Sequence, residues 1–481
     1  MTRRAGDSRI REGGYAEVLT LALPLILSTS SWAVQHFVDR MFLAWYSPQA
    51  IAAAMPAGML NFTLMSFFVG TAGYVSTFVA QYDGAGMHHR VGPVTWQGLY
   101  VSVVGGLVLL AMVPPADVIF AMVGHEEAVR ANEVVYFRYL CAGSFPAIAS
   151  AALSGLFTGL GRTVTVMWIT VSATALNLVL DYGMIFGRIG LPEMGIKGAA
   201  LATVASGVFS MASYASLMSF GALRKRYAVL EGWRFDPELF KRLVRFGAPS
   251  GIQFFLDMAG FACFVLIVGR LGTVSLAATN IAFNINTIAF MPMIGVGIAV
   301  SVLVGRYIGG GRPDVAQRST YAGFAITSAY MITVAALYVF FPSIFTAPFA
   351  HGSQAELFPQ IENLTKTLLR FVAVYSVFDT MNVVFSSALK GAGDTRFVMI
   401  AIVLLSAGVL VVPTFVMIAV LGMGVLAAWV TATAYVSLLG LVFYMRFLAG
   451  KWRSMKVIER PCARGHIATV LPECPDSAIE P

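Results

Sequence analysis

Residues 70–86 read GTAGYVSTFVAQYDGAG, and a similar pattern returns at residues 295–311 as GVGIAVSVLVGRYIGGG. The second stretch lies 225 positions after the first and repeats its glycines, its Val-Ser pair and its tyrosine. A fixed shift that aligns such residues indicates an internal duplication. The shared positions are Gly70, Val75, Ser76, Val79, Tyr82, Gly84 and Gly86 in the first copy.

The duplication extends beyond these two stretches. The same shift places Pro24 on Pro249, and a shift of 232 places Gly159 on Gly391 and carries the following glycine and threonine with it. The glycine-rich segments stand where apolar runs end, so we interpret them as tight turns between helices. The chain is therefore predicted to consist of two similar halves.

The composition indicates that these halves lie in a membrane. Apolar residues make up 58% of the 481 residues, charged residues 12%, and the mean hydropathy is +0.77. Only a bilayer accommodates so much apolar surface, and its helices must satisfy their own backbone hydrogen bonds. We predict twelve spans at residues 16–46, 51–82, 93–115, 132–160, 164–187, 195–220, 242–270, 273–307, 316–343, 364–390, 395–420 and 423–448.

The predicted fold is an all-α polytopic membrane protein of two six-helix lobes. An even number of spans per repeat makes both repeats enter from the same side, so a pseudo-two-fold axis should run along the membrane normal. The expected division is a cytoplasmic segment 1–15, an N-lobe 16–220, a cytoplasmic linker 221–241, a C-lobe 242–448 and a cytoplasmic tail 449–481, expected to be disordered.

The net charge of +8 raises the question of a nucleic-acid partner. Most of the basic residues, including the run Arg224–Arg226, fall in the tails and in every second loop. The positive-inside rule explains this bias, so we expect no nucleic acid and both termini in the cytoplasm. The sequence contains no P-loop, HExxH or GxSxG motif, so we expect neither an enzyme nor an ATP-driven pump, and no cofactor.

Two acidic residues in the first half are predicted to form a cation site. Asp39 and Asp181 each lie about seven residues, or ~10 Å, from the outer end of a span. Asn177 is one turn from Asp181 on the same face, and Thr203 falls at a similar depth in the next span. Buried carboxylates are costly, so such a group is a functional site by default, with a structural hydrogen bond as the alternative. Oxygen ligands suit Na⁺, and two neighbouring carboxylates can share a proton.

The second half has its own acids at a different depth. Asp257 and Asp379 lie near the middle of their spans, where they could attract a cationic substrate or bind a second cation. The first cluster has no counterpart in the repeat, because the equivalent positions hold Phe264, Val409 and Pro413.

The sequence around these acids resembles the MATE family of multidrug and toxic compound extrusion transporters, of the NorM and DinF type. The resemblance covers about residues 16–448 and rests on LALPLILSTSSWAVQHFVDRMFLAW, NLVLDYGMIFG, FFLDMAGF and VFDTMNVVFSSALKGAGDTR. It implies that Asp39, Asn177, Asp181 and Thr203 bind the coupling cation. The acids that the family carries in its second lobe map onto Asp257 and Asp379. Arg40 departs from the family pattern, because an uncharged residue is usual after the first-helix aspartate; Arg40 could pair with Asp39. His36, one turn earlier, could relay protons or simply pack.

These observations predict a monomeric plasma-membrane antiporter that exports drugs or toxic metabolites in exchange for Na⁺ or H⁺. Alternating access between the lobes would couple the two fluxes. One alternative is a flippase for lipid-linked oligosaccharides from the same superfamily, which would favour basic residues in the cavity over acidic ones. A passive channel is the other, and a duplicated fold with an asymmetric acid cluster argues against it.

Overall fold

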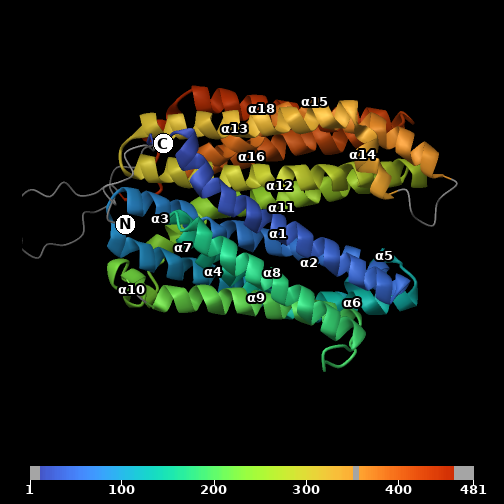
Figure 1. Cartoon of the computed structure of the whole chain (residues 1–481), viewed down its shortest axis with the longest axis horizontal. Coiled ribbons are helices and arrows are strands. Elements are labelled where there is room, and N and C mark those ends of the chain that lie inside the picture. Colours follow the sequence, from blue (N-terminus) through green and yellow to red (C-terminus); the bar gives the residue numbers. More distant parts are fainter. Residues whose placement is uncertain (1–10, 221, 350–356, 460–481) are drawn as a thin grey trace, which may run out of the picture.

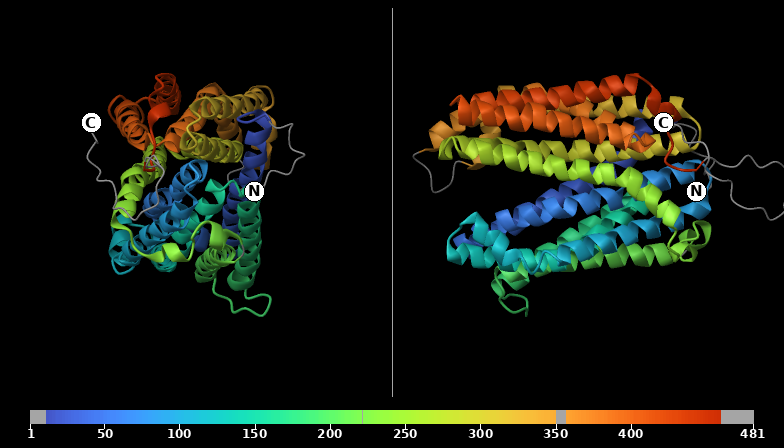
Figure 2. Two further views of the ribbon diagram at one scale, coloured as in Figure 1. Left: turned by 90° about the vertical axis from the view of Figure 1, so that its left-hand side faces the viewer. Right: turned by 180° about the vertical axis from the view of Figure 1, so that it is seen from behind.

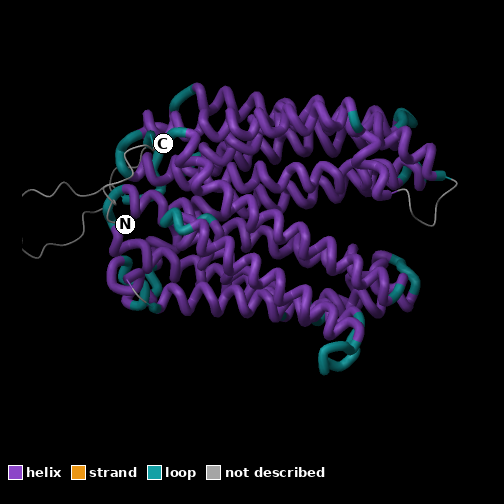
Figure 3. The backbone as a smooth tube through the Cα atoms, in the orientation of Figure 1, coloured by secondary structure: helices purple, strands orange, loops and turns teal. Residues whose placement is uncertain are grey.

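The computed structural model describes residues 11–220, 222–349 and 357–459. Eleven helices in this part of the chain are long and apolar enough to cross a membrane, and a bent helix pair makes a twelfth span. The elements are helices joined by short loops, with no strand among the described residues (Figure 3). Each of the twelve predicted spans coincides with one of these helical spans.

The spans begin and end as follows (Figure 1). The N-lobe contains α1 (Tyr15–Tyr46), α2 (Pro48–Gly73) with α3 (Val75–Gly84), α4 (Val91–Leu110), α6 (Glu127–Ala142) with α7 (Ser144–Gly159), α8 (Thr163–Phe186) and α9 (Ile196–Ser219). The C-lobe contains α11 (Pro237–Gly269), α12 (Thr273–Gly309), α13 (Pro313–Phe340), α15 (Phe358–Ala392), α16 (Thr395–Leu405) continued through η4 (Ser406–Val411), α17 (Val412–Phe415) and η5 (Val416–Val420), and α18 (Val425–Leu448). Shorter elements are η1 (His88–Arg90), α5 (Ala116–Val123), α10 (Ala222–Arg226), η2 (Glu231–Trp233), α14 (Pro342–Thr346), η3 (Ala347–Phe349) and η6 (Lys451–Ser454).

The bent span consists of α6 and α7, which meet at Gly143 with an angle of 44°. Pro146 lies in the first turn after the break, and its ring and missing N–H destabilise the helix at that point. Gly143 itself packs against Val204, where a Cβ would lie 2.1 Å from a methyl carbon. The break therefore has a local cause in the sequence.

The two lobes approach each other at one end of the molecule and diverge toward the other (Figures 1 and 2). The first and last described residues lie at the closed end, which also carries the loops around 85–90, 160–162, 220–236, 310–312 and 393–394. We call this the N/C end. The opposite end, which carries α5 and α14, is called the distal end.

The duplication predicted from the sequence is confirmed by backbone packing. A Cβ built on Gly84 would lie 1.9 Å from the carbonyl oxygen of Arg306, and one on Gly309 would lie 2.2 Å from that of Gln81. These two contacts are related by the shift of 225, so α3 and α12 cross each other on the pseudo-two-fold axis. Both helices need glycine there, because any side chain would collide with the partner backbone.

A second glycine pair repeats this relation within each lobe. A Cβ on Gly159 would lie 2.5 Å from the carbonyl oxygen of Ser76, and one on Gly391 would lie 2.4 Å from that of Ser301. The neighbouring Gly161 and Gly393 adopt positive φ values of 73° and 112° and form the expected turns. The glycine motifs thus serve both helix crossing and helix termination.

Hydrogen bonds between the lobes lie from mid-length to the N/C end. Thr29 Oγ1 donates to the carbonyl oxygen of Met291 at 3.0 Å, and Tyr74 Oη donates to that of Lys390 at 2.7 Å. Closer to the N/C end, Gln81 Nε2 donates to the carbonyl oxygen of Gly391 at 2.9 Å. The structure therefore represents a state closed at the N/C end.

The expectation of a disordered tail from residue 449 is wrong for its first part. Trp452 is 1% exposed and stacks on Phe447 with ring centroids 4.7 Å apart, and Val457 and Ile458 are buried. The polar composition of the whole tail conceals these three apolar residues, which find a partner surface on the C-lobe. The rest of the tail, residues 460–481, and most of the N-terminal segment, residues 1–10, lie outside the described residues.

Candidate functional site

The N-lobe acids meet as the sequence predicts. Asp39 on α1 is 6% exposed, and Asn177 and Asp181 on α8 are fully buried. With its amide nitrogen turned toward the acids, Asn177 donates to Asp39 Oδ1 at 3.0 Å and to Asp181 Oδ2 at 3.2 Å. The i, i+4 spacing on α8 puts amide and carboxyl group on one face, and α1 supplies the second carboxyl group from the neighbouring helix.

The two carboxyl groups of this cluster also interact with each other electrostatically. Two neighbouring carboxyl groups can share one proton. The other oxygen of Asp181, Oδ1, is buried without a hydrogen-bond partner among the described residues. A buried carboxylate oxygen left without a partner is costly, and a proton or a small cation would satisfy it. The donor set therefore fits a hard cation or a proton.

Two further residues border the cluster and were missed in the sequence. Gln35, one turn before Asp39, lies 3.2 Å from the Asn177 amide and also accepts a 3.5 Å bond from Thr174 Oγ1. Tyr136 on α6 is an electrostatic neighbour of both acids and is buried. The i, i+4 relation between Gln35 and Asp39 could have revealed the first, whereas nothing local reveals the second.

Three predicted contributors do not contact the acids in this structure. Thr203 Oγ1 donates to the Ala199 carbonyl oxygen at 3.0 Å within α9. Arg40 is exposed and makes no ion pair with Asp39 within 4.0 Å, so the possible Arg40–Asp39 pair is not formed in this structure. His36 packs edge-on against Trp32 with ring centroids 4.4 Å apart, which is the packing alternative for this histidine.

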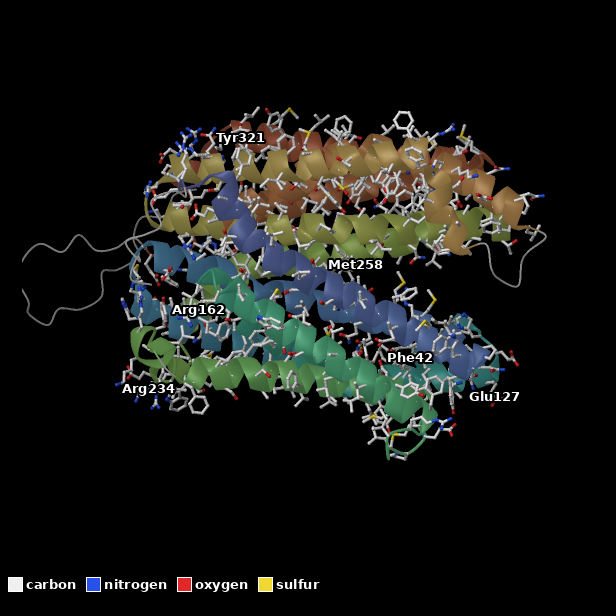
Figure 4. The ribbon with its side chains drawn as sticks, in the orientation of Figure 1. Phe42, Glu127, Arg162, Arg234, Met258 and Tyr321 are labelled. Carbon is white, nitrogen blue, oxygen red and sulfur yellow. The ribbon has the colours of Figure 1, made fainter. Side chains whose placement is uncertain are left out.

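The C-lobe acids form a second polar cluster. Asp257 on α11 and Asp379 on α15 are electrostatic neighbours, and Asn382 Nδ2 donates to Asp379 Oδ1 at 3.1 Å. Gln253, one turn before Asp257, interacts with its carboxyl group, and Tyr435 on α18 is an electrostatic neighbour of both acids. Figure 4 labels Met258, which follows Asp257 on α11, and Phe42, which is three residues after Asp39 on α1. The two acid pairs lie on helices of different lobes.

Lys390 is a member of this second cluster that was missed in the sequence, where it is the last residue of the predicted span 364–390. It lies in the last turn of α15, and its ammonium group interacts with Asp257. It follows Asp379 by eleven residues, which is close to three helical turns, so both side chains fall on one face. The spacing of Asp379 and Lys390 could therefore have revealed Lys390 as a member of the cluster from the sequence.

Aromatic residues connect the surroundings of the two clusters. Trp32 lies 5.5 Å from Phe62 on α2, and Phe62 lies 5.8 Å from Phe254 on α11, measured between ring centroids. Trp32 is 40% exposed and Phe254 is partly exposed, whereas Tyr375 is buried. Tyr375 therefore belongs to the core of the C-lobe.

A further buried acid lies in α6 near the distal end. Glu133 is fully buried, accepts a 2.7 Å bond from His125 Nδ1 through Oε1, and leaves Oε2 without a partner in the described chain. Glu133 was missed in the sequence, because it is the second residue of the predicted span 132–160. In the structure α6 begins at Glu127, five residues before that boundary.

The fold and the two polar clusters define a two-lobed polytopic membrane protein with ionisable groups buried in both lobes. The MatE family model matches residues 24–183 and 249–417, which is more than half of the chain. The protein therefore belongs to the MatE family, as the resemblance in the sequence predicted. The two matched segments begin at Pro24 and Pro249, the same pair that marks the duplication.

Relatives with assigned names are similar over most of their length. The probable multidrug resistance protein NorM of Thermotoga maritima is 27% identical over 92% of this chain and 94% of its own. The probable NorM protein of Bradyrhizobium diazoefficiens is 29% identical over 79% and 82%. The multidrug resistance protein PmpM of Pseudomonas aeruginosa is 27% identical over 80% of each chain.

Solved structures share the fold. A transporter of the MOP superfamily from Pyrococcus furiosus superposes with a TM-score of 0.83 at 19% identity, over 91% of this chain and 96% of that one. A multidrug resistance MATE transporter of the same superfamily, described as outward-facing, superposes with a TM-score of 0.82 at 20% identity, over 91% and 96%. The twelve-helix, two-lobe architecture is thus that of MATE transporters.

Proposed function

We propose that the protein is a secondary active multidrug exporter that moves amphipathic, often cationic compounds out of the cell in exchange for Na⁺ or H⁺. The observation that carries this proposal is the buried Asp39–Asp181 pair, which the Asn177 amide bridges and whose Asp181 Oδ1 has no hydrogen-bond partner among the described residues. The names of the relatives, which are multidrug resistance proteins, support the same substrate class.

The N/C end would face the cytoplasm of a plasma membrane. Arg90, Arg242 and Arg312 lie at this end, as do the runs Arg224–Arg226 and Lys451–Lys456. The positive-inside rule places such residues on the cytoplasmic side. A structure closed at the N/C end is then closed to the cytoplasm. We also propose that the protein acts as a monomer.

Coupling would arise because the cation binds one of the two lobe arrangements more tightly than the other. A cation on Asp39 and Asp181 satisfies Asp181 Oδ1 and removes net charge from the N-lobe, which changes the packing of α1 against α8. A ligand shifts a conformational equilibrium only by such a difference in affinity. The C-lobe acids, Asp257 and Asp379, would attract cationic substrates to the space between the lobes.

The acidic C-lobe cluster favours a cationic substrate over the pyrophosphate of a lipid-linked oligosaccharide. Two carboxyl groups there face one ammonium group, that of Lys390. A flippase for an anionic headgroup would need the opposite balance of charge.

Transport into vesicles tests the proposal directly. Purified protein in inside-out vesicles should accumulate a fluorescent lipophilic cation when a Na⁺ or a H⁺ gradient is imposed separately, and an ionophore that collapses the effective gradient should stop it. Asp39→Asn should remove accumulation, with exposed Asp314→Asn as the matched control. Gradient-independent equilibration that does not saturate would instead identify a channel.

A further inference from the structure

Two repeat-related tyrosines at the N/C end each bind a carboxylate of the other lobe. Tyr307 of the C-lobe donates to both carboxylate oxygens of Glu17 on α1 at 2.8 Å. Tyr82 of the N-lobe, 225 positions earlier, donates to Glu459 Oε2 at 2.8 Å. Both hydrogen bonds therefore join the lobes, at positions related by the pseudo-two-fold axis.

The two carboxylates come from different places in the chain. The repeat position of Glu17 in the second half is 242, and this residue is an arginine. Arg242 cannot accept a hydrogen bond from Tyr82, because a guanidinium group only donates. Glu459 occupies the place of the missing acceptor, and its Oε1 lies 3.2 Å from Arg242 Nη1 and 3.0 Å from Arg90 Nη2.

Segment 449–459 holds Glu459 at this position. The stacked Trp452 fixes the beginning of the segment to α18, and Val457 donates its backbone N–H to Gln81 Oε1 at 2.9 Å. Gln81 Nε2 simultaneously donates to the Gly391 carbonyl oxygen. One buried glutamine on the pseudo-two-fold axis thus ties the segment, the N-lobe and α15 together.

We propose that Tyr307–Glu17 and Tyr82–Glu459 are a pair of latches that hold the lobes closed at the N/C end, and that segment 449–459 must release Tyr82 before the lobes separate there. This inference rests on the alternating access of the proposed function. Both residues of the first latch lie on membrane-spanning helices, α1 and α12. In the second latch, Glu459 comes from segment 449–459, which crosses from the C-lobe to the N-lobe. Any partner that binds this segment would therefore affect opening.

The expected strength of the latches suits a step that reverses in every cycle. Hydrogen bonds to a carboxylate are stronger than neutral ones. Glu459 and Arg90 are nevertheless 27% and 32% exposed, so water screens their attraction. The second latch should therefore shift the equilibrium without locking it.

Distances between the lobes at the N/C end test the proposal. Spin labels on His89→Cys in the N-lobe and Arg396→Cys in the C-lobe, in a background with the four native cysteines replaced by serine, report the separation by pulsed electron resonance in lipid nanodiscs. Glu459→Gln should raise the ratio of open to closed molecules about tenfold, given the usual value of a charged hydrogen bond. Glu238→Gln, an exposed acid at the same end, is the control and should leave the ratio unchanged.

The repeat also predicts a rescue. Arg242→Glu places a carboxylate at the position equivalent to Glu17, so it should give Tyr82 a charged acceptor again in place of the weaker glutamine amide oxygen and restore the closed population in the Glu459→Gln protein. Failure of this rescue in protein that elutes and melts like the wild type would refute the equivalence of the two latches. An unchanged distance distribution in a folded Glu17→Gln, Glu459→Gln double variant would refute the whole proposal.

The measurement needs neither substrate nor gradient. A protein that shows the predicted shifts but transports nothing would retain the latches and lose the proposed function. A protein that transports, but whose spin-label distances do not change when Glu17 and Glu459 are substituted, would retain the proposed function and refute the latches.

Discussion

The N-lobe and the C-lobe have the same arrangement of helices but carry their polar residues at different positions. Asp39 corresponds by repeat to Phe264, which is 1% exposed and packs against Phe283 and Trp429 at 5.8 and 6.4 Å between ring centroids. Conversely, Asp257 corresponds to Trp32. Each lobe thus has an apolar side chain where the other has an acid.

This difference separates what the duplication conserves from what it leaves free. The glycine crossings at Gly84, Gly159, Gly309 and Gly391 tolerate no side chain, so both copies retain them. Positions that only face a neighbouring side chain can change in chemistry without changing the fold. The position of Asp39 holds a buried acid in one lobe and part of an aromatic core in the other.

The largest expected effect is that of Asp39→Asn on cation-coupled export. Removal of a group that merely supports a metal ligand costs about 10–100-fold, so removal of a direct ligand should cost at least as much. Folding should survive, because an amide is cheaper to bury than a carboxylate. Vesicle transport and the melting temperature in detergent measure the two properties. Asp39→Asn protein that still concentrates the drug against a gradient would contradict the cation site.

Phe264→Ala at the equivalent position should show the opposite pattern. The loss of a buried phenylalanine costs about 3–5 kcal/mol of stability. The melting temperature should therefore fall well below that of Asp39→Asn, while coupled transport below the transition persists. If Phe264→Ala instead abolished coupling with an unchanged melting temperature, the two lobes would share one functional position.

Most of the fold could be predicted from the sequence, because span length, repeat glycines and basic loops are local signals. The meeting of Asp39, Asn177 and Asp181 was also predictable, since their depths can be counted along helices. Tyr136 and the buried packing of Tyr375 could not be predicted, because they depend on how helices rotate about their axes. Segment 449–459 was misjudged because average composition hides a few apolar residues that find a specific surface.

A smaller effect is expected from the C-lobe acids and should depend on substrate charge. Asp257→Asn or Asp379→Asn should weaken transport of a cationic substrate about fivefold, as expected for a partly solvated charge pair, and that of a neutral substrate less. Lys390→Met removes a positive charge from the same cluster, so it should have the opposite effect and strengthen the transport of cationic substrates. Competition assays with paired substrates measure the ratio. Equal losses for both substrates, together with lost cation binding, would assign these acids to the ion site.

The smallest effect is expected for Thr203, and it decides how far the N-lobe site extends. The resemblance to the family implies a ligand role for this hydroxyl group, yet the structure turns it to the Ala199 carbonyl oxygen within α9. Thr203→Val removes the hydroxyl group and keeps the shape, so Na⁺- and H⁺-driven transport should stay within about twofold of wild type, as for most substitutions that leave no buried group unpaired. Asn177→Ala provides the comparison, because it removes the amide that binds both acids and should impair Na⁺ coupling more than H⁺ coupling. The half-saturating Na⁺ concentration measures both variants. A Thr203→Val protein as impaired toward Na⁺ as Asn177→Ala would mean that Thr203 turns from its own helix to the cation, and the site would then include α9.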